Sequence, residues 1–169
     1  MFSTIILLIA AAAASIYTIT AFLLRRGMNQ GFTTERRQES ALPRISVIVP
    51  ARNEEKLLPA CLNSLSRLAY PSGRLEIILV NDRSDDATGE IMEAFAAKHT
   101  NTRYVRLSSL TPGMTGKSSA LSKGAAAASG EFLFFTDADC IVPPCWIEHT
   151  LRYYTEDTAL IGGAMTLAE

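Results

Sequence analysis

The sequence predicts an α/β fold with a mainly parallel sheet flanked by helices, preceded by one apolar N-terminal helix. Short apolar or β-branched runs alternate with helical segments along residues 44–169, which is typical of βαβ units. Right-handed crossovers in such units place helices on both faces of the sheet. The absence of charged side chains from residues 1–24 predicts the N-terminal helix.

Residues 1–24 are predicted to be a transmembrane anchor, because a helix of that length can cross the roughly 30 Å hydrocarbon core of a bilayer. A secretory signal peptide would carry basic residues before its apolar stretch, and none precede this one. A signal peptide and an unusually long buried helix remain as alternatives. Arg25 and Arg26 follow the apolar stretch directly, so the positive-inside rule places the main domain in the cytoplasm.

Residues 25–43 are polar and predict a juxtamembrane linker, and residues 44–169 predict one domain. The apolar and β-branched runs predict strands over 45–49, 75–80, 102–107, 132–136 and 159–165. Apolar side chains at helical spacing, or an alanine-rich composition, predict helices over 55–68, 86–98, 117–129 and 144–154. Ser84 or Asp85 is available as an N-cap for the second of these helices. The run 132–136 has the uninterrupted apolar character of a buried parallel strand.

Charge and cysteine content narrow the classes of function. Residues 45–169 carry 11 basic and 15 acidic side chains, a net charge of −4, without a basic stripe, so nucleic acid is not expected as a partner. The odd number of cysteines, at positions 61, 140 and 145, lacks the spacing of a metal site. These thiols are expected to be reduced and mostly to serve packing.

Polar residues follow three of the predicted strands, at the edge where open α/β sheets bind their ligands. Glu54, Glu55, Asp85 and Asp86 lie in these loops and are suited to capping helices. Asp82, Asp137 and Asp139 follow their strands immediately. The pair Asp137 and Asp139 suits Mg²⁺ or Mn²⁺ shared with a substrate phosphate, although paired acids are also common in solvated loops.

Lys117 opens a predicted helix, where a lysine and free backbone N–H groups can meet a phosphate. A solvated lysine is the alternative. The neighbouring residues do not form a P-loop, because Thr111 stands where the first glycine of that motif would fall.

Four motifs, in this order and spacing, resemble glycosyltransferase family 2. The residues that carry the resemblance are Ile45–Glu55, Ile78–Thr88, the Gly116-Lys117-Ser118-Ser119-Ala120-Leu121 segment with Gly124, and the Phe134–Asp139 segment. The resemblance covers about residues 44–169 and implies a GT-A fold, which is a Rossmann-like nucleotide-binding half. It further implies an inverting hexosyl- or N-acetylhexosaminyltransferase that uses a nucleotide sugar, most often a uridine diphosphate sugar. The acceptor would be a lipid or a cell-envelope polysaccharide at a bacterial inner membrane.

Site roles follow from the same resemblance. Pro50, Ala51, Arg52 and Glu54 would line the nucleotide pocket. Asp82 would hydrogen-bond the base. Lys117 would lie near the diphosphate. Asp137 would contact the ribose and diphosphate and share the metal, Mg²⁺ or Mn²⁺, with Asp139.

The catalytic base is the point at which this chain departs from the family pattern. The family places a general base in the acceptor-binding half, and no candidate is expected before Glu169. The chain is therefore expected to be the donor-binding half of a larger enzyme, which binds a nucleotide sugar but transfers it poorly alone. A non-catalytic nucleotide-sugar-binding module or inactive fragment is the alternative. A sugar nucleotidyltransferase is disfavoured, because the Gly- and Arg-rich opening loop of that class is absent.

Overall fold

The structure is a computed structural model that describes residues 2–28, 42–155 and 157–163. The chain divides into two compact units, Met1–Glu35 and Arg36–Glu169, and each is described by itself. Most of the predicted linker, residues 25–43, lies outside the described residues.

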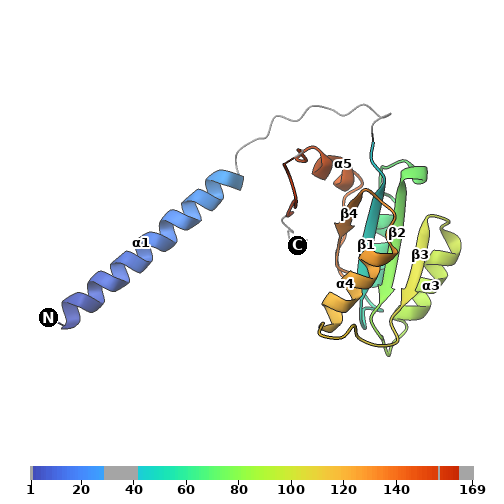
Figure 1. Ribbon diagram of the computed structural model, residues 1–169, viewed down its shortest axis with the longest axis horizontal. Coiled ribbons are helices and arrows are strands. Elements are labelled where there is room, and N and C mark those ends of the chain that lie inside the picture. Colours follow the sequence, from blue (N-terminus) through green and yellow to red (C-terminus); the bar gives the residue numbers. More distant parts are fainter. Residues whose placement is uncertain (1, 29–41, 156, 164–169) are drawn as a thin grey trace. The chain divides into compact units, whose positions relative to one another are not determined.

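The first unit contains the helix α1 (Phe2–Met28), drawn in blue in Figure 1. Hydroxyl side chains of α1 donate hydrogen bonds back into the helix: Ser15 Oγ to the Ala11 carbonyl and Thr20 Oγ1 to the Ile16 carbonyl, each at 2.8 Å. The predicted membrane-spanning segment, residues 1–24, falls on this helix. Among the described residues, no helix is long and apolar enough to cross a membrane.

The second unit is built on a four-stranded parallel sheet with strand order β3-β2-β1-β4 (Figure 1). The strands are β1 (Ile45–Ala51), β2 (Leu75–Asn81), β3 (Thr102–Arg106) and β4 (Phe132–Phe135). The helices are α2 (Leu58–Leu65), α3 (Thr88–Lys98), α4 (Gly116–Ala127) and α5 (Trp146–Leu151), with a short 3₁₀ helix η2 (Ser72–Arg74) before β2. The prediction of a parallel α/β fold is confirmed.

The larger hydrophobic core lies on one face of the sheet. There Val47 of β1 and Leu79 of β2 pack with Leu62 of α2, Met92 of α3 and Ile147 of α5. Each of these side chains is almost fully buried. Burial of this kind stabilises the fold by roughly 1.5–3 kcal/mol for each large apolar side chain.

The opposite face carries a smaller core under α4. Ile48 of β1 and Val80 of β2 cluster there with Ala120 of α4. A Cβ atom added at Gly124 would collide with the side chain of Ile48 and press on Val80. Small residues on α4 therefore let its backbone approach the sheet closely.

The helices α2 and α3 begin later than the sequence predicts, at Leu58 and Thr88 rather than at residues 55 and 86. The predicted N-caps of α3, Ser84 and Asp85, are wrong, because the N-cap is Ala87 and it makes no side-chain capping bond. The reason is tertiary: the polar residues before both helices form hydrogen bonds between the two loops, as described for the functional site.

The end of the domain differs from the prediction in two respects. Phe134 of β4 is buried, but Leu133 and Phe135 are 41% and 46% exposed. They fall on the face that α4 covers over β1 and β2, so the prediction of a fully buried strand is wrong for that face. The predicted strand 159–165 does not form over residues 159–163, which include two consecutive glycines that weaken strand formation. Residues 164 and 165 lie outside the described residues.

A carboxylate fastens the amino edge of the sheet to the turn between α4 and β4. Glu76 Oε1 accepts hydrogen bonds from the hydroxyl of Ser46 and from both the backbone N–H and the hydroxyl of Ser129. The backbone N–H of Gly130 in turn donates to Ser46 Oγ at 2.7 Å. Burial opposes ionisation of Glu76, but these hydrogen bonds outweigh it and hold the pKa of Glu76 below its ordinary value.

Replacement of Glu76 by alanine is expected to lower the free energy of unfolding at pH 7 by about 1–3 kcal/mol, because Ser46 and Ser129 lose their acceptor. Urea denaturation of the parent and variant measures the difference. The exposed residue Glu93 on α3 supplies a matched control, Glu93→Ala.

The difference in the free energy of unfolding between the parent and Glu76→Ala should depend on pH. A lowered folded pKa means that the carboxylate contributes stability above its unfolded pKa of about 4.3, and that this contribution is lost as the pH falls through the folded pKa. The difference in the free energy of unfolding between the parent and Glu76→Ala should therefore become smaller below about pH 4. A gap that stays constant down to about pH 2 would contradict this account.

Candidate functional site

Loops from all four strands reach the carboxyl edge of the sheet, because the strands are parallel. These loops span residues 52–57, 82–87, 107–115 and 136–145. They bring the candidate residues of four separate sequence motifs to one edge of the sheet.

Pro50 and Ala51 are buried and form the last two positions of β1, where they pair with Val80 and Asn81. The strand therefore extends two residues beyond the predicted end. Proline is tolerated in this central strand because pairing with β4 ends at Ile48. The missing N–H of Pro50 would point to that side, where the ladder has already ended.

The loops after β1 and β2 are joined by reciprocal hydrogen bonds, which we call the loop clasp. The backbone N–H of Asn53 donates to Ser84 Oγ at 3.1 Å, and that of Asp85 donates back to Asn53 Oδ1 at 2.9 Å. The backbone N–H of Glu55 donates to Asp86 Oδ2 at 3.2 Å. Asn53 adopts a left-handed backbone with a φ of 57°, which asparagine tolerates better than most residues.

The loop clasp engages the carboxylates of two of the four acidic residues that the sequence analysis assigned to helix caps, Glu55 and Asp86. Glu55 Oε2 accepts from the Ala87 N–H at 3.1 Å. Hydrogen bonds from Thr88 are the main cause that holds the pKa of Asp86 below its ordinary value. The backbone N–H of Glu54 donates to Thr88 Oγ1 at 2.8 Å. Glu54 itself is half-buried and Arg52 is exposed.

Asp82 lies directly after β2, and its carboxylate is buried. Its backbone N–H donates to the Ala51 carbonyl at 2.8 Å, which continues the β1–β2 ladder by one residue. Both Nε and Nη2 of Arg83 lie 2.9 Å from Asp82 Oδ1. The negative charge is thus paired at the floor of the site.

Gly116, the first residue of α4, lies against this pair. A Cβ atom added at Gly116 would be 2.6 Å from Asp82 Oδ2 and 3.4 Å from Arg83 Nη2. The amino end of α4 therefore approaches the Asp82 carboxylate more closely than any residue with a side chain would allow.

Lys117 and Asp137 form a second ion pair on the rim of the site. Lys117 Nζ lies 2.9 Å from Oδ1 and 3.1 Å from Oδ2 of Asp137. The hydrogen bond with Asp137 is the main cause that raises the pKa of Lys117. Both side chains are substantially exposed, so this pair contributes little to stability and remains accessible to a ligand.

Asp139 is exposed, and two cysteines contact the segment from Asp137 to Asp139. Cys140 Sγ is 3.4 Å from Asp139 Oδ1, and Cys61 Sγ is 3.6 Å from the carbonyl oxygen of Asp137. Burial is the main cause that raises the pKa of Cys61 to about 12, so this thiol stays protonated. Cys61 is also part of the larger core, which agrees with the packing role that the sequence predicted.

The chemistry of this edge fits a divalent cation that takes most of its ligands from a substrate. Asp137 and Asp139 supply hard carboxylate oxygens of the type that Mg²⁺ and Mn²⁺ prefer. Among the described residues, no group of three or more His, Cys, Asp or Glu side chains could hold a metal ion. A cation here would thus need phosphate or water oxygens to complete its coordination.

The structure brings Asp82, Lys117 and Asp137 to the same sheet edge and gives two of them a basic partner. The sequence analysis assigned no role to Arg83, although it follows Asp82 directly. The ion pair between them was hidden because adjacent side chains in an extended chain point in opposite directions. Only the left-handed backbone of Arg83, with a φ of 55°, brings them together.

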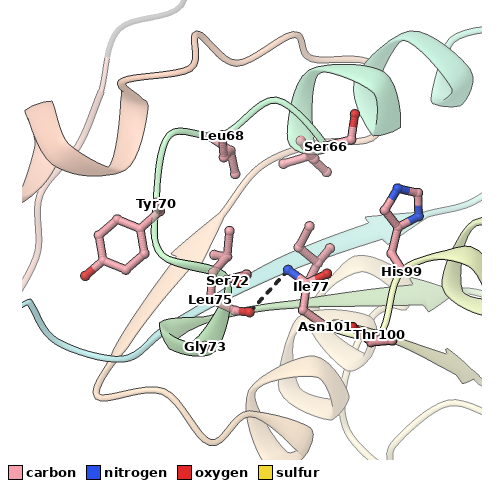
Figure 2. A pocket seen from close by; sticks show the side chains of 11 residues that line it. Ser66, Leu68, Tyr70, Ser72, Gly73, Leu75, Ile77, His99, Thr100 and Asn101 are labelled. Atoms are coloured by element: carbon pink, nitrogen blue, oxygen red, sulfur yellow. Dashed lines mark hydrogen bonds between the residues drawn. The ribbon is translucent and has the colours of Figure 1, made fainter.

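A cavity of about 430 Å³ lies at the other edge of the sheet, before β2 and β3. Figure 2 shows Tyr70, His99 and Asn101 around it, with Asn101 Nδ2 donating to the Leu75 carbonyl at 3.3 Å. The sequence-predicted site residues lie at the carboxyl edge and do not line this cavity.

Comparison with known proteins identifies the domain. Residues 46–167 match the family model described as Glycosyl transferase family 2. The probable glycosyltransferase YdaM of Bacillus subtilis is 39% identical over 124 residues, which are 70% of this chain and 29% of that protein. The chain therefore spans less than a third of the length of this curated relative.

Two solved structures are similar to the chain. The mannosyltransferase PcManGT from Pyrobaculum calidifontis, in complex with GDP-Man and Mn²⁺, has a TM-score of 0.71 at 24% identity, over 88% of this chain and 43% of that one, and it shows the shared fold. S. aureus TarS 1-349 in complex with UDP-GlcNAc has a TM-score of 0.52 at 32% identity, over 63% of this chain and 29% of that one.

The left-handed turn in the loop clasp predicts a difference between two variants of Asn53. Asn53→Gly and Asn53→Ala both remove the acceptor for the Asp85 N–H, but the positive φ at this position is strained for alanine and not for glycine. We expect Asn53→Ala to lower the free energy of unfolding by about 1 kcal/mol more than Asn53→Gly. Thermal and urea denaturation measure the free energy of unfolding of the two variants. Equal destabilisation would show that the loop relaxes out of the left-handed conformation.

Proposed function

The chain belongs to glycosyltransferase family 2, and on that premise we propose that it binds a nucleotide sugar for transfer to a lipid or glycan acceptor. The observation that carries this proposal is the meeting of Asp82, Lys117 and Asp137 at the carboxyl edge of one parallel sheet. This edge is where open α/β sheets bind their ligands.

The donor that we propose is a uridine diphosphate sugar. TarS, at 32% identity, has been solved in complex with UDP-GlcNAc. Pro50, Ala51, Arg52 and Glu54 would line the nucleotide pocket, since β1 ends there. The buried carboxylate of Asp82 would accept a hydrogen bond from the base.

Two positive charges would act on the diphosphate. When bound, Mg²⁺ or Mn²⁺ held by Asp137 and Asp139 would supply electrostatic stabilisation of the diphosphate. Lys117 would contribute a second positive charge from the start of α4. Because Lys117 pairs with Asp137, a bound diphosphate would offer its ammonium group a second anionic partner.

The reaction that we propose is an inverting displacement. An acceptor hydroxyl oxygen forms a bond to C1 of the sugar, on the face opposite the diphosphate. The bond between C1 and the diphosphate oxygen breaks, and its electron pair leaves with the diphosphate. A general base takes the acceptor proton. The chain's own residues named above hold the leaving group and stabilise its charge.

Binding of UDP-GlcNAc, measured by calorimetry, tests the proposed donor site. We expect the parent chain to bind it more tightly in Mn²⁺ than in chelator. Asp139→Asn should weaken binding in Mn²⁺ by about 1–3 kcal/mol, the cost of one lost charged contact, and should change binding in chelator little. Asp157→Asn, at an exposed position, is the matched control. Equal affinity of the parent and Asp139→Asn in Mn²⁺ would remove Asp139 from the metal site.

We further propose that residues 1–24 attach the chain to a bacterial inner membrane, with the domain in the cytoplasm. The uncharged stretch and the arginines that follow it, Arg25 and Arg26, support this proposal from the sequence. Added protease should then digest the domain in inverted membrane vesicles but not in right-side-out vesicles. Release of the chain by an alkaline wash, or digestion only from the outer side, would overturn it.

A further inference from the structure

We propose that Arg83 is a positioning residue for nucleobase recognition, which holds the buried Asp82 carboxylate so that Oδ2 alone is presented to the base. This inference rests on the proposed function, since it takes the nucleotide to bind at the carboxyl edge. Among the described residues, the Arg83 side chain forms its hydrogen bond and its ion pair with Asp82 alone. Arg83 acts through that contact rather than on the base itself.

The backbone of the turn after β2 is what allows Arg83 to act on its neighbour. In an extended strand, consecutive side chains point to opposite faces, so Asp82 and Arg83 would not meet. The left-handed conformation of Arg83, with a φ of 55°, bends the extended backbone at this point. The Ser84 N–H closes the turn by donating to Asn81 Oδ1 at 2.9 Å.

Both guanidinium contacts go to the same carboxylate oxygen. Arg83 Nε and Nη2 each lie 2.9 Å from Asp82 Oδ1. Within residues 42–155, no protein donor forms a hydrogen bond with Oδ2. The guanidinium therefore pairs the buried charge and leaves one oxygen for a ligand.

The chemistry of Oδ2 selects a class of base. A carboxylate paired with a guanidinium accepts hydrogen bonds but has no proton to donate. Uracil and guanine present an N–H donor on the pairing edge of the ring, whereas cytosine and adenine present a bare nitrogen acceptor at the corresponding position. Oδ2 of Asp82 should therefore favour uracil or guanine, and the proposed donor contains uracil.

Gly116 restricts the position of Oδ2 from the other side. A methyl group at this position would lie 2.6 Å from Oδ2, and 3.4 Å from Arg83 Nη2. The carboxylate is thus held between a guanidinium on one oxygen and the α4 backbone near the other. A change at Gly116 would move Oδ2 without changing any charge.

The experiment measures the dissociation constants of UDP and CDP for the full chain and its variants. We expect the parent to bind UDP at least about tenfold more tightly than CDP, because a site that forms a hydrogen bond rejects a ligand lacking the partner. Arg83→Asn should reduce this preference to about threefold or less, mainly through weaker UDP binding. Asparagine is chosen because it tolerates a left-handed backbone. Arg83→Lys, which keeps the charge, should retain more of the preference.

A second variant, at Gly116, would displace the Asp82 carboxylate by steric contact. Gly116→Ala should also lower the preference for UDP over CDP, whereas Gly73→Ala, where an added Cβ would meet nothing within 4 Å, should not. Arg67→Asn, at an exposed position, is the control for the loss of an arginine. Melting temperatures of all variants separate local effects from unfolding.

The outcomes distinguish this inference from the proposed function. If Arg83→Asn weakens UDP and CDP equally and keeps their ratio, Arg83 has only a structural role and the inference is wrong. If the parent binds UDP without preference over CDP, the base is not read by Asp82 and the inference is also wrong, while the donor site stands. If the parent binds neither nucleotide, the proposed function itself is wrong.

Discussion

Parallel pairing on both sides of β1 is the constraint on which the rest of the structure depends. Because β1 pairs with β2 and with β4 in the same direction, the loops after these strands emerge at one edge. The chain must then cross the sheet between strands, and α2, α3 and α4 provide those crossings. The two hydrophobic cores that result hold the edge loops on a rigid base. The acidic residues of distant motifs become neighbours for this reason.

The electrostatic design of the edge follows from how deeply each carboxylate lies. Asp82 is buried, so it needs a partner that stays in place, and Arg83 supplies one from the adjacent position. Asp137 lies on the rim, and its partner Lys117 is the more exposed of the two. A pair with a buried carboxylate suits a fixed recognition element, while an exposed pair can exchange its partners when a charged ligand arrives. The two ion pairs thus divide the site into a fixed floor and an adaptable rim.

The loop clasp shows that polar residues near the site can hold loops in place without taking part in a reaction. Asn53, Glu55 and Asp86 use their side chains to join two loops, which ties the end of β1 to the end of β2. This arrangement shortens α2 and α3 at their amino ends, since the residues that could have continued the helices are already engaged. Acidic residues near the site therefore differ in their contacts: some join the loops, and others are left to the proposed donor site.

The sequence by itself determined the alternation of strands and helices, since that depends on local apolar periodicity, and it also located Asp82, Lys117 and Asp137 through their motifs. Only the tertiary structure decided the exact helix starts, because these depend on hydrogen bonds between residues some thirty positions apart, such as Asn53 and Asp85. It also decided the exposure of Leu133 and Phe135, which depends on how far α4 extends over the sheet. The ion pair of Asp82 with Arg83 and the approach of Gly116 to it were likewise beyond sequence reasoning. They follow from one left-handed backbone angle and from the packing of α4, and neither leaves a periodic signal in the chain.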